Sequence, residues 1–195
     1  MKFKKLLNNS NTEFEGPVEI FQEVFKDSRG YFFETWNEKK FNNMISKNVS
    51  FVQDNQSYSE KGTLRGLHYQ LDPEAQGKLV RATTGKVFDV IVDLRINSKT
   101  FSNWAGIILD SETKNQIWIP QGFAHGFLTL SEEAIVEYKV TNFWNKVLDR
   151  SLLWSDHKLS IEWPFSDLIK SPNLSKKDSE ASSLSTVIEK GDIFK

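Results

Sequence analysis

The stretch VFDVIVDLR, residues 87–95, decides the fold class because its side chains alternate along an extended chain. Every second residue belongs to one face of such a strand. The first face is apolar and consists of Phe88, Val90, Val92 and Leu94. The second face carries Asp89, Ile91, Asp93 and Arg95. This period of two predicts a β-strand.

The same signal extends in both directions along the chain. Residues 134–140, AIVEYKV, alternate in the same way and place Tyr138 on a face of small and branched apolar side chains. Residues 116–130 indicate a strand, a Pro-Gln-Gly turn and a second strand, and residues 18–36 indicate short strands around a turn at Gly30. Short strands with turn signals at intervals of about 8–12 residues are typical of an antiparallel sandwich or barrel.

One short helix is expected over residues 37–45, where Asn37 can cap a turn that carries Phe41, Met44 and Ile45 at helical spacing. The 195 residues predict a single domain spanning 1–195. Its core is expected over about residues 18–178. The Ser-rich and charged tail, 179–195, is expected to be partly loose.

The composition of the chain limits the kinds of partner and compartment that we expect for the protein. The net charge of −1 gives no overall field that would attract nucleic acid or a membrane surface, so any anion site must be local. The chain has no cysteine, which excludes disulfides and a thiol nucleophile. No apolar run approaches the roughly 18 residues of a membrane span, and only Leu6 and Leu7 stand where a signal peptide would have its apolar core. We therefore expect a cytoplasmic protein.

The stretch LRGLHYQ, residues 64–70, contains one of the three histidines inside an apolar strand. A neutral imidazole can accept a proton near neutral pH, so His68 is a candidate base. A hydrogen-bonded core histidine is an equally valid interpretation. On a regular strand Arg65 points away from His68, so both can face one ligand only if the strand has a bulge near Gly66.

Other polar residues suit a binding pocket, although each also has a purely structural interpretation. His125 lies among small residues in GFAHGF, and Gln53 and Asn55 share one face of FVQDNQS. The cations beside strand or turn signals could bind a diphosphate or lie on the surface: Arg29, Arg65, Lys78 and Arg81.

Two aromatic residues could likewise have either a functional or a purely structural role. Tyr138 could donate a proton inside a barrel or simply fill the core. Trp144 could stack on a ring or pack.

The sequence offers little for a metal or a nucleotide cofactor. Cupin metal sites commonly use His-x-His, but Gln70 stands where the second histidine would be, and the three histidines are far apart in the chain. No Gly-x-Gly-x-x-Gly and no P-loop occurs. We expect no metal and no cofactor.

Seven blocks, in this order, closely resemble the dTDP-4-dehydrorhamnose 3,5-epimerase family. They are FKDSRGYFFETW, FVQDNQS, GTLRGLHYQ, QGKLVRATTGKVFDVIVDLR, WIPQGFAHGF, AIVEYK and SKKD, between residues 25 and 178. The resemblance implies an all-β fold, a double-stranded β-helix (cupin-like jelly roll) with a few short helices. It also implies a homodimer that works without a metal.

The resemblance also assigns roles by matched position. His68 is the general base, Asp178 orients and polarises it, and Tyr138 is the acid on the opposite side of the sugar. Lys78 is the candidate for holding the C4 enolate. The remaining substrate contacts are Arg29, Glu34, Gln53, Asp54, Asn55, Arg65, His125, Asp149 and Lys177.

Two positions depart from the family's usual residues. Trp144 stands where a tyrosine usually stacks on the thymine, which preserves stacking but not a hydroxyl contact. Asp149 stands where a glutamate is common, so its contact is one methylene shorter.

The implied substrate is a dTDP-4-keto-6-deoxy sugar, and the implied reaction epimerises C3 and C5 beside the C4 ketone in dTDP-rhamnose biosynthesis. Three alternatives remain at this stage. They are an enzyme that epimerises one carbon or isomerises a related ketosugar, a barrel that binds sugar nucleotides without catalysis, and a metal-dependent cupin oxygenase.

Overall fold

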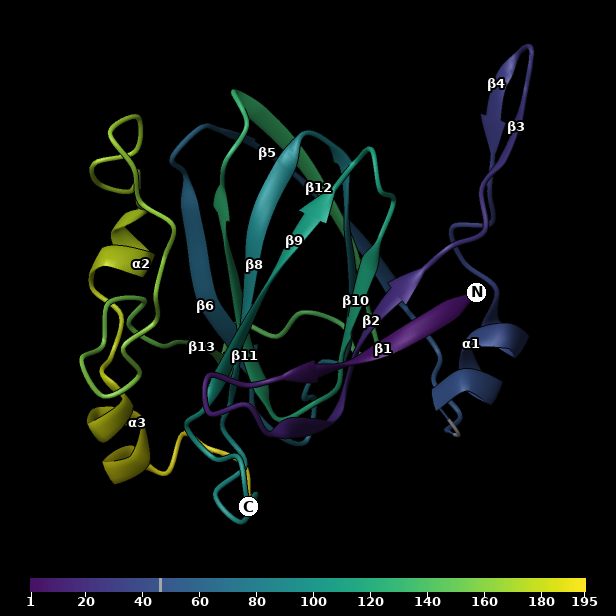
Figure 1. Cartoon of the computed structure of the whole chain (residues 1–195). Coiled ribbons are helices and arrows are strands. Elements are labelled where there is room, and N and C mark those ends of the chain that lie inside the picture. Colours follow the sequence, from purple (N-terminus) through teal and green to yellow (C-terminus); the bar gives the residue numbers. More distant parts are fainter. Residues whose placement is uncertain (46) are drawn as a thin grey trace.

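The computed structural model describes residues 1–45 and 47–195 and contains two antiparallel sheets packed face to face (Figure 1). The first sheet has six strands in the order β1 (Lys2–Leu7), β2 (Glu13–Phe21), β10 (Gln116–Ile119), β7 (Lys78–Thr84), β12 (Glu133–Val140) and β5 (Gln53–Glu60). The second has the order β13 (Asp149–Ser151), β6 (Leu64–Gln70), β11 (Phe123–Thr129), β8 (Lys86–Asp93) and β9 (Trp104–Asp110).

The predicted fold class is confirmed. The inner faces of the two sheets share a buried apolar core that includes Val80 of β7, Ile91 of β8 and Val136 of β12. The described helices are short: α1 (Glu38–Ile45), α2 (Lys176–Ser179) and α3 (Leu184–Lys190). No helix in the described part of the chain is long and apolar enough to cross a membrane.

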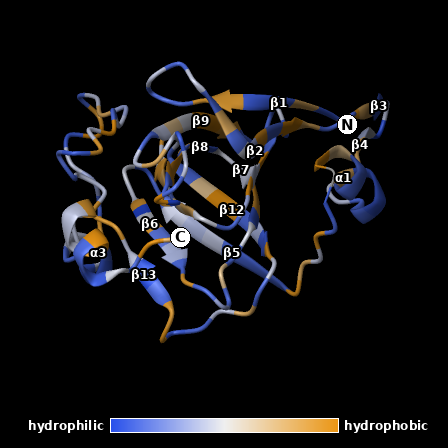
Figure 2. Ribbon diagram, turned by 90° about the horizontal axis from the view of Figure 1, so that it is seen from below, coloured by the Kyte–Doolittle hydropathy of each residue, from blue (hydrophilic) through white to orange (hydrophobic). Residues whose placement is uncertain are grey.

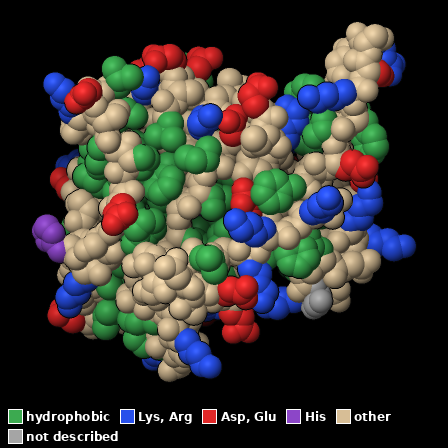
Figure 3. Space-filling model, viewed as in Figure 1, with side chains coloured by type: hydrophobic (Ala, Val, Ile, Leu, Met, Phe, Trp, Pro, Cys, Tyr) green, Lys and Arg blue, Asp and Glu red, His purple; other side chains and the backbone are tan. Residues whose placement is uncertain are grey.

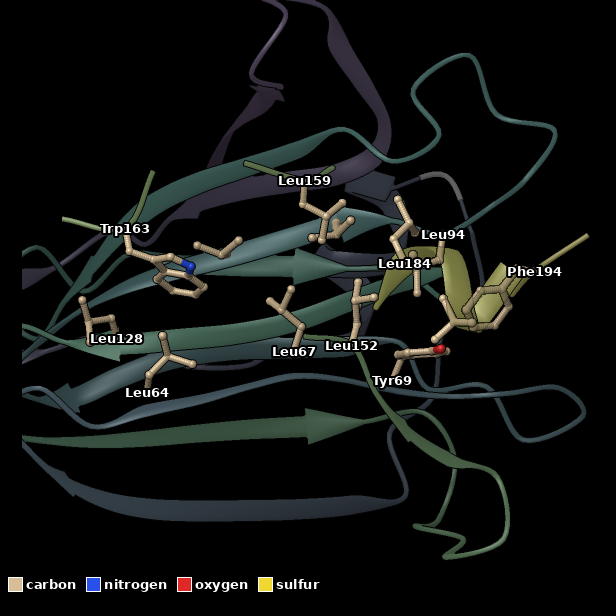
Figure 4. Close-up of a cluster of buried hydrophobic side chains, with 14 of the residues drawn as sticks. Leu64, Leu67, Tyr69, Leu94, Leu128, Leu152, Leu159, Trp163, Leu184 and Phe194 are labelled. Atoms are coloured by element: carbon tan, nitrogen blue, oxygen red, sulfur yellow. The ribbon is translucent and has the colours of Figure 1, made fainter. Parts of the chain in front are cut away.

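Strand β8 is buried on both faces, which explains why apolar residues occur on both of them. Val87 and Ile91 point into the core between the sheets. Val90, Val92 and Leu94 point outward, where the C-terminal segment covers them. In Figure 4 side chains of that segment lie against side chains from the strands of the second sheet.

The expectation of a partly loose tail over 179–195 is wrong. Leu184, Val187 and Phe194 are buried in the core cluster outside the second sheet. Leu184 and Val187 lie three positions apart on one side of α3, and the Ser183 hydroxyl caps that helix. Because most residues of the tail are polar, its composition did not indicate that Leu184 and Val187 form an apolar stripe. Figure 2 shows α3 on one side of the sandwich, opposite α1.

Strand β6 is irregular at Gly66. On a regular strand Arg65 and His68 would point to opposite faces, so an irregularity was expected between them. His68 pairs with His125 and Arg65 pairs with Phe127, so the register shifts between them. Gly66 has φ of +120°, and a Cβ there would lie 2.6 Å from the Cα of Gly126. The bulge is therefore confirmed, and glycine is needed for this close approach of β6 to β11.

The segment between the sandwich strands β2 and β5 forms an arm. It contains the hairpin β3 (Phe25–Asp27) and β4 (Gly30–Phe32), followed by α1. The strands around Gly30 and the helix are as predicted, and the Asn37 side chain accepts from the Lys40 backbone N–H at 3.0 Å. The hairpin projects away from the sandwich (Figures 1 and 3).

Candidate active site

A cavity of about 280 Å³ lies between the two sheets. Its lining combines residues from both sheets with two from the C-terminal segment: Ser57, Arg65, His68, Lys78, His125, Gly126, Phe127, Tyr138, Ser175 and Asp178. The four residues for which the sequence predicts catalytic roles therefore meet in one place.

His68 and Asp178 form a pair at the wall formed by the second sheet. The His68 Nε2 atom lies 2.5 Å from Asp178 Oδ1. Burial acts to raise the pKa of the Asp178 carboxyl, but the hydrogen bond and charge of His68 and the Ser175 hydroxyl outweigh it, so the pKa lies below its ordinary value. Asp178 is thus an ionised partner that can orient the ring and stabilise its protonated form.

Asp178 is held in place by the start of helix α2. The Ser175 hydroxyl donates to Asp178 Oδ2 at 2.7 Å and accepts from the Asp178 backbone N–H at 3.2 Å. This is the N-cap geometry that a serine followed three residues later by an acid favours. The carboxylate therefore reaches His68 in a defined orientation.

Tyr138 lies on the facing sheet, on strand β12. Burial raises the pKa of its phenol, Arg65 acts to lower it and Asp149 to raise it, so the phenol keeps its proton at neutral pH. His68 and Tyr138 consequently line one cavity from opposite walls, one able to accept a proton and the other able to donate one.

Lys78 is buried at the cavity, with its ammonium group donating to the backbone carbonyl of His68 at 3.2 Å. Burial lowers its pKa to about 8, while Asp149 and Asp89 act to raise it and Lys177 to lower it. At neutral pH Lys78 is mostly protonated, which makes it a cation poised beside the cavity.

His125 has a buried carboxylate partner. Its Nε2 atom lies 2.8 Å from Asp89 Oδ2, and Asp89 is fully buried. Burial lowers the pKa of His125, and the charge and hydrogen bond of Asp89 oppose that effect without overcoming it. His125 is therefore a neutral ring at neutral pH.

Arg65 lines the same cavity as His68 because of the bulge at Gly66. Its Nε donates to the Ser59 hydroxyl at 2.9 Å, and one terminal nitrogen donates to the Tyr58 carbonyl at 2.8 Å. These bonds hold the guanidinium against β5. The predicted proximity of Arg65 and His68 is confirmed.

Other predicted contact residues lie around the cavity rather than in its lining. Gln53 donates to Asn55 at 2.8 Å and accepts from the backbone N–H of Trp144 at 3.1 Å. The Trp144 side chain is 57% exposed, so its ring is accessible to a ligand. Asp54 pairs with Lys139 at 2.8 Å.

Asp149 and Lys177 form an ion pair of 2.5 Å between β13 and α2, close enough to Lys78 for both charges to shift its pKa.

Arg29 and Glu34 are not brought to the cavity of their own chain. Arg29 lies on the projecting hairpin, where it pairs with Asp27 of the same hairpin at 2.6 Å (Figure 1). Glu34 pairs with Lys40 of α1 and accepts from Asn37. Neither residue lines the cavity beside His68.

Sequence reasoning missed two residues that support the site. Asp89 was placed on a strand face without a role, although a carboxylate alternating with Val87 and Ile91 has to find a buried partner. Ser175 is the first residue of the SKKD block. The pattern of a serine three residues before an acid could have identified it as a cap.

Among residues 1–45 and 47–195, no three His, Cys, Asp or Glu side chains converge as a ligand set for a metal ion. The two histidines paired across β6 and β11 each hydrogen-bond a carboxylate of their own chain instead.

Comparisons with known proteins agree with this geometry. The family model described as dTDP-4-dehydrorhamnose 3,5-epimerase matches residues 11–186. The enzyme of that name from Shigella flexneri is 51% identical over 172 residues, covering 88% of this chain and 93% of that protein.

Two crystal structures are similar over nearly the whole chain. The dTDP-4-dehydrorhamnose 3,5-epimerase of Elizabethkingia anophelis has a TM-score of 0.86 at 44% identity, covering 95% of this chain and 97% of that one. A 3,5-epimerase of Legionella pneumophila, in complex with dTDP-4-keto-L-rhamnose, has a TM-score of 0.89 at 39% identity, covering 100% and 98%. The chain belongs to the dTDP-4-dehydrorhamnose 3,5-epimerase family.

Proposed function

We propose that the protein epimerises C3 and C5 of dTDP-4-dehydro-6-deoxy-D-glucose to give dTDP-4-dehydro-L-rhamnose, in dTDP-rhamnose biosynthesis. One observation carries the assignment. In a chain of this family, the His68–Asp178 pair and Tyr138 line a single cavity from opposite sheets. Inversion at a carbon needs such a two-sided site, because the proton leaves one face and returns to the other.

The reaction begins with removal of a proton from a carbon beside the C4 ketone. His68 accepts this proton at a ring nitrogen, and the ionised Asp178 stabilises the imidazolium that forms. The electrons of the broken C–H bond move into an enolate whose charge lies on the C4 oxygen. The ketone makes the hydrogen acidic enough for this step, so no oxidation is required.

The enolate needs a positive or hydrogen-bonding group beside the C4 oxygen. Lys78 serves this purpose, since its ammonium group is buried at the cavity where electrostatic stabilisation is strong. His125 lies next to it in the lining and contacts the sugar. Tyr138 then returns a proton to the carbon from the opposite face, and the same sequence applies to C3 and to C5.

The nucleotide part of the substrate extends from the cavity along β5. Arg65 binds the diphosphate, because a guanidinium fixed by Ser59 and Tyr58 presents its remaining donors to phosphate oxygens. Gln53, Asp54, Asn55, Asp149 and Lys177 contribute polar contacts around it. The exposed ring of Trp144 stacks on the thymine.

The protein acts as a homodimer in the cytoplasm, with the whole chain as one epimerase domain. The position of Arg29 supports the dimer, because its hairpin projects away from the sandwich and a substrate contact from it would come from a second chain. The hairpin that carries Arg29 also exposes Phe25, Tyr31 and Phe32, which is typical of a surface that another protein covers.

Deuterium exchange tests the assignment. The purified protein, treated with a chelator, is incubated in D₂O with dTDP-4-dehydro-6-deoxyglucose, and NMR follows label at each carbon. Label at both C3 and C5 is expected, together with the L-rhamno product, and His68→Asn should abolish both.

Label at one of C3 and C5 would replace the assignment with a single-carbon epimerase. Label at C4, with the ketone moved to C3, would replace it with a ketoisomerase. A bound but unlabelled sugar nucleotide would mean a binding protein, and loss of activity on chelation would restore the metal-dependent alternative.

A further inference from the structure

Asp89 is a charged side chain that the proposed chemistry does not use. It lies on β8 with 0% of its surface exposed. Its Oδ2 atom accepts from His125, whereas its Oδ1 atom is buried and has no hydrogen-bond partner within residues 1–45 and 47–195. A buried carboxylate with an unsatisfied oxygen is costly, and a purely structural role would be better served by an apolar side chain.

The surroundings of Asp89 connect it to the floor of the cavity. Its neighbours along the inward face of β8 are the apolar residues Val87 and Ile91. The polar groups near it belong to the cavity lining, namely His125 of β11 and Lys78 of β7. Asp89 therefore lies behind two of the residues that face the substrate.

We infer that Asp89 is a positioning residue of the epimerase that acts through His125 and Lys78, fixing the tautomer of the ring and keeping the amine protonated. The inference rests on the proposed function, because that function places Lys78 beside the C4 oxygen and His125 against the sugar.

The hydrogen bond determines the tautomer of His125. A neutral imidazole bonds to a carboxylate only through an N–H group, so the proton lies on Nε2. The Nδ1 atom then keeps its lone pair and can accept a hydrogen bond from a sugar hydroxyl. Without Asp89 the ring could take either tautomer and could rotate.

Two carboxylates act to raise the pKa of Lys78: Asp149, which has the larger effect, and Asp89. Lys78 has charged groups near it on several elements: Asp89 of β8, Asp149 of β13 and Lys177 of α2, together with His125 of β11 and the carbonyl of His68 on β6. Asp149 is already paired with Lys177 at 2.5 Å. Asp89 bonds only a neutral ring, so its charge remains available to Lys78.

The test is the pH profile of kcat for Asp89→Asn. The amide keeps an oxygen that accepts from His125 but removes the charge. Loss of an opposite charge lowers the pKa of a buried ammonium by about one unit or more, so the alkaline limb of the profile should move down by at least about one pH unit. At pH 8 this gives a loss of about fivefold or more in kcat relative to wild type, with recovery near pH 6.5 and little change in KM.

The matched control is Asp110→Asn, on the neighbouring strand β9, which removes a carboxylate paired with Lys86 at 2.9 Å at the sheet edge. Its profile should coincide with wild type. A profile of Asp89→Asn that also coincides with wild type, or one lowered equally at every pH, would overturn the inference.

A wild-type measurement keeps the inference testable if Asp89→Asn does not fold. Nitrogen-15 NMR of histidine-labelled protein should show His125 as the Nε2–H tautomer, and the Nδ1–H tautomer would refute the inference. Absence of label exchange by wild type would instead refute the proposed function, so the two failures are distinguishable.

Discussion

The Nε2 atom of His68 lies 2.5 Å from the Oδ1 atom of Asp178, although 110 positions separate the two residues in the chain. His68 belongs to the second sheet, and Asp178 belongs to the C-terminal segment that packs on the outside of that sheet. The base is therefore completed only when the C-terminal segment folds onto the sandwich.

Replacing Asp178 by Asn should lower kcat by at least about tenfold, because the neutral amide cannot stabilise the imidazolium that forms on His68. The affinity for dTDP should stay within about twofold of wild type, since Asp178 contacts the base rather than the nucleotide. Initial rates by NMR and calorimetric titration with dTDP measure the two quantities. Wild-type turnover in this variant would remove Asp178 from the mechanism.

The packing of α3 on the second sheet should contribute strongly to stability. Leu184 is 3% exposed, and its replacement by Ala should lower the free energy of unfolding by about 2–5 kcal/mol. Ile188, on the same helix, is 36% exposed and provides the matched control, with a cost of about 1 kcal/mol or less. Urea unfolding of both variants tests the contrast. Equal costs at the two positions would show that the tail is not docked in solution.

Gly66 should tolerate no side chain. Gly66→Ala and Gly30→Ala both place alanine at positive φ, +120° and +129°, which costs about 1–3 kcal/mol of backbone strain. A Cβ at Gly66 would also lie 2.8 Å from the carbonyl oxygen of His125, whereas one at Gly30 meets no atom within 4 Å. Urea unfolding should therefore show an additional loss of about 1–3 kcal/mol for Gly66→Ala. Similar losses for the two variants would mean that β6 and β11 do not approach as closely as described.

The sequence predicted those parts of the fold that depend on local pattern. Strand alternation in residues 87–95 and 134–140, the turn at Gly30 and the Asn37 cap are all properties of neighbouring residues. The bulge at Gly66 was predictable for a related reason, because two residues of opposite parity could share a ligand only through an irregular strand.

The rest depends on contacts between distant segments. Nothing in the composition of the tail indicates that Leu184 and Phe194 cover β8, because that surface is created by the folded sheet. The partner of His125 could not be identified as Asp89 without the register that aligns β8 with β11. The position of Arg29 away from the cavity likewise depends on the direction in which the hairpin leaves the sandwich.

The central claim is that His68 removes the proton and Tyr138 returns it from the opposite wall. The most direct measurement follows Tyr138→Phe in D₂O with the 4-keto sugar nucleotide, recording both label incorporation and inversion at C3 and C5. The account predicts that His68 still exchanges label with retention of configuration, while inversion falls by at least about a hundredfold. Inversion at the wild-type rate, or loss of exchange together with inversion, would contradict the assignment of base and acid to opposite sheets.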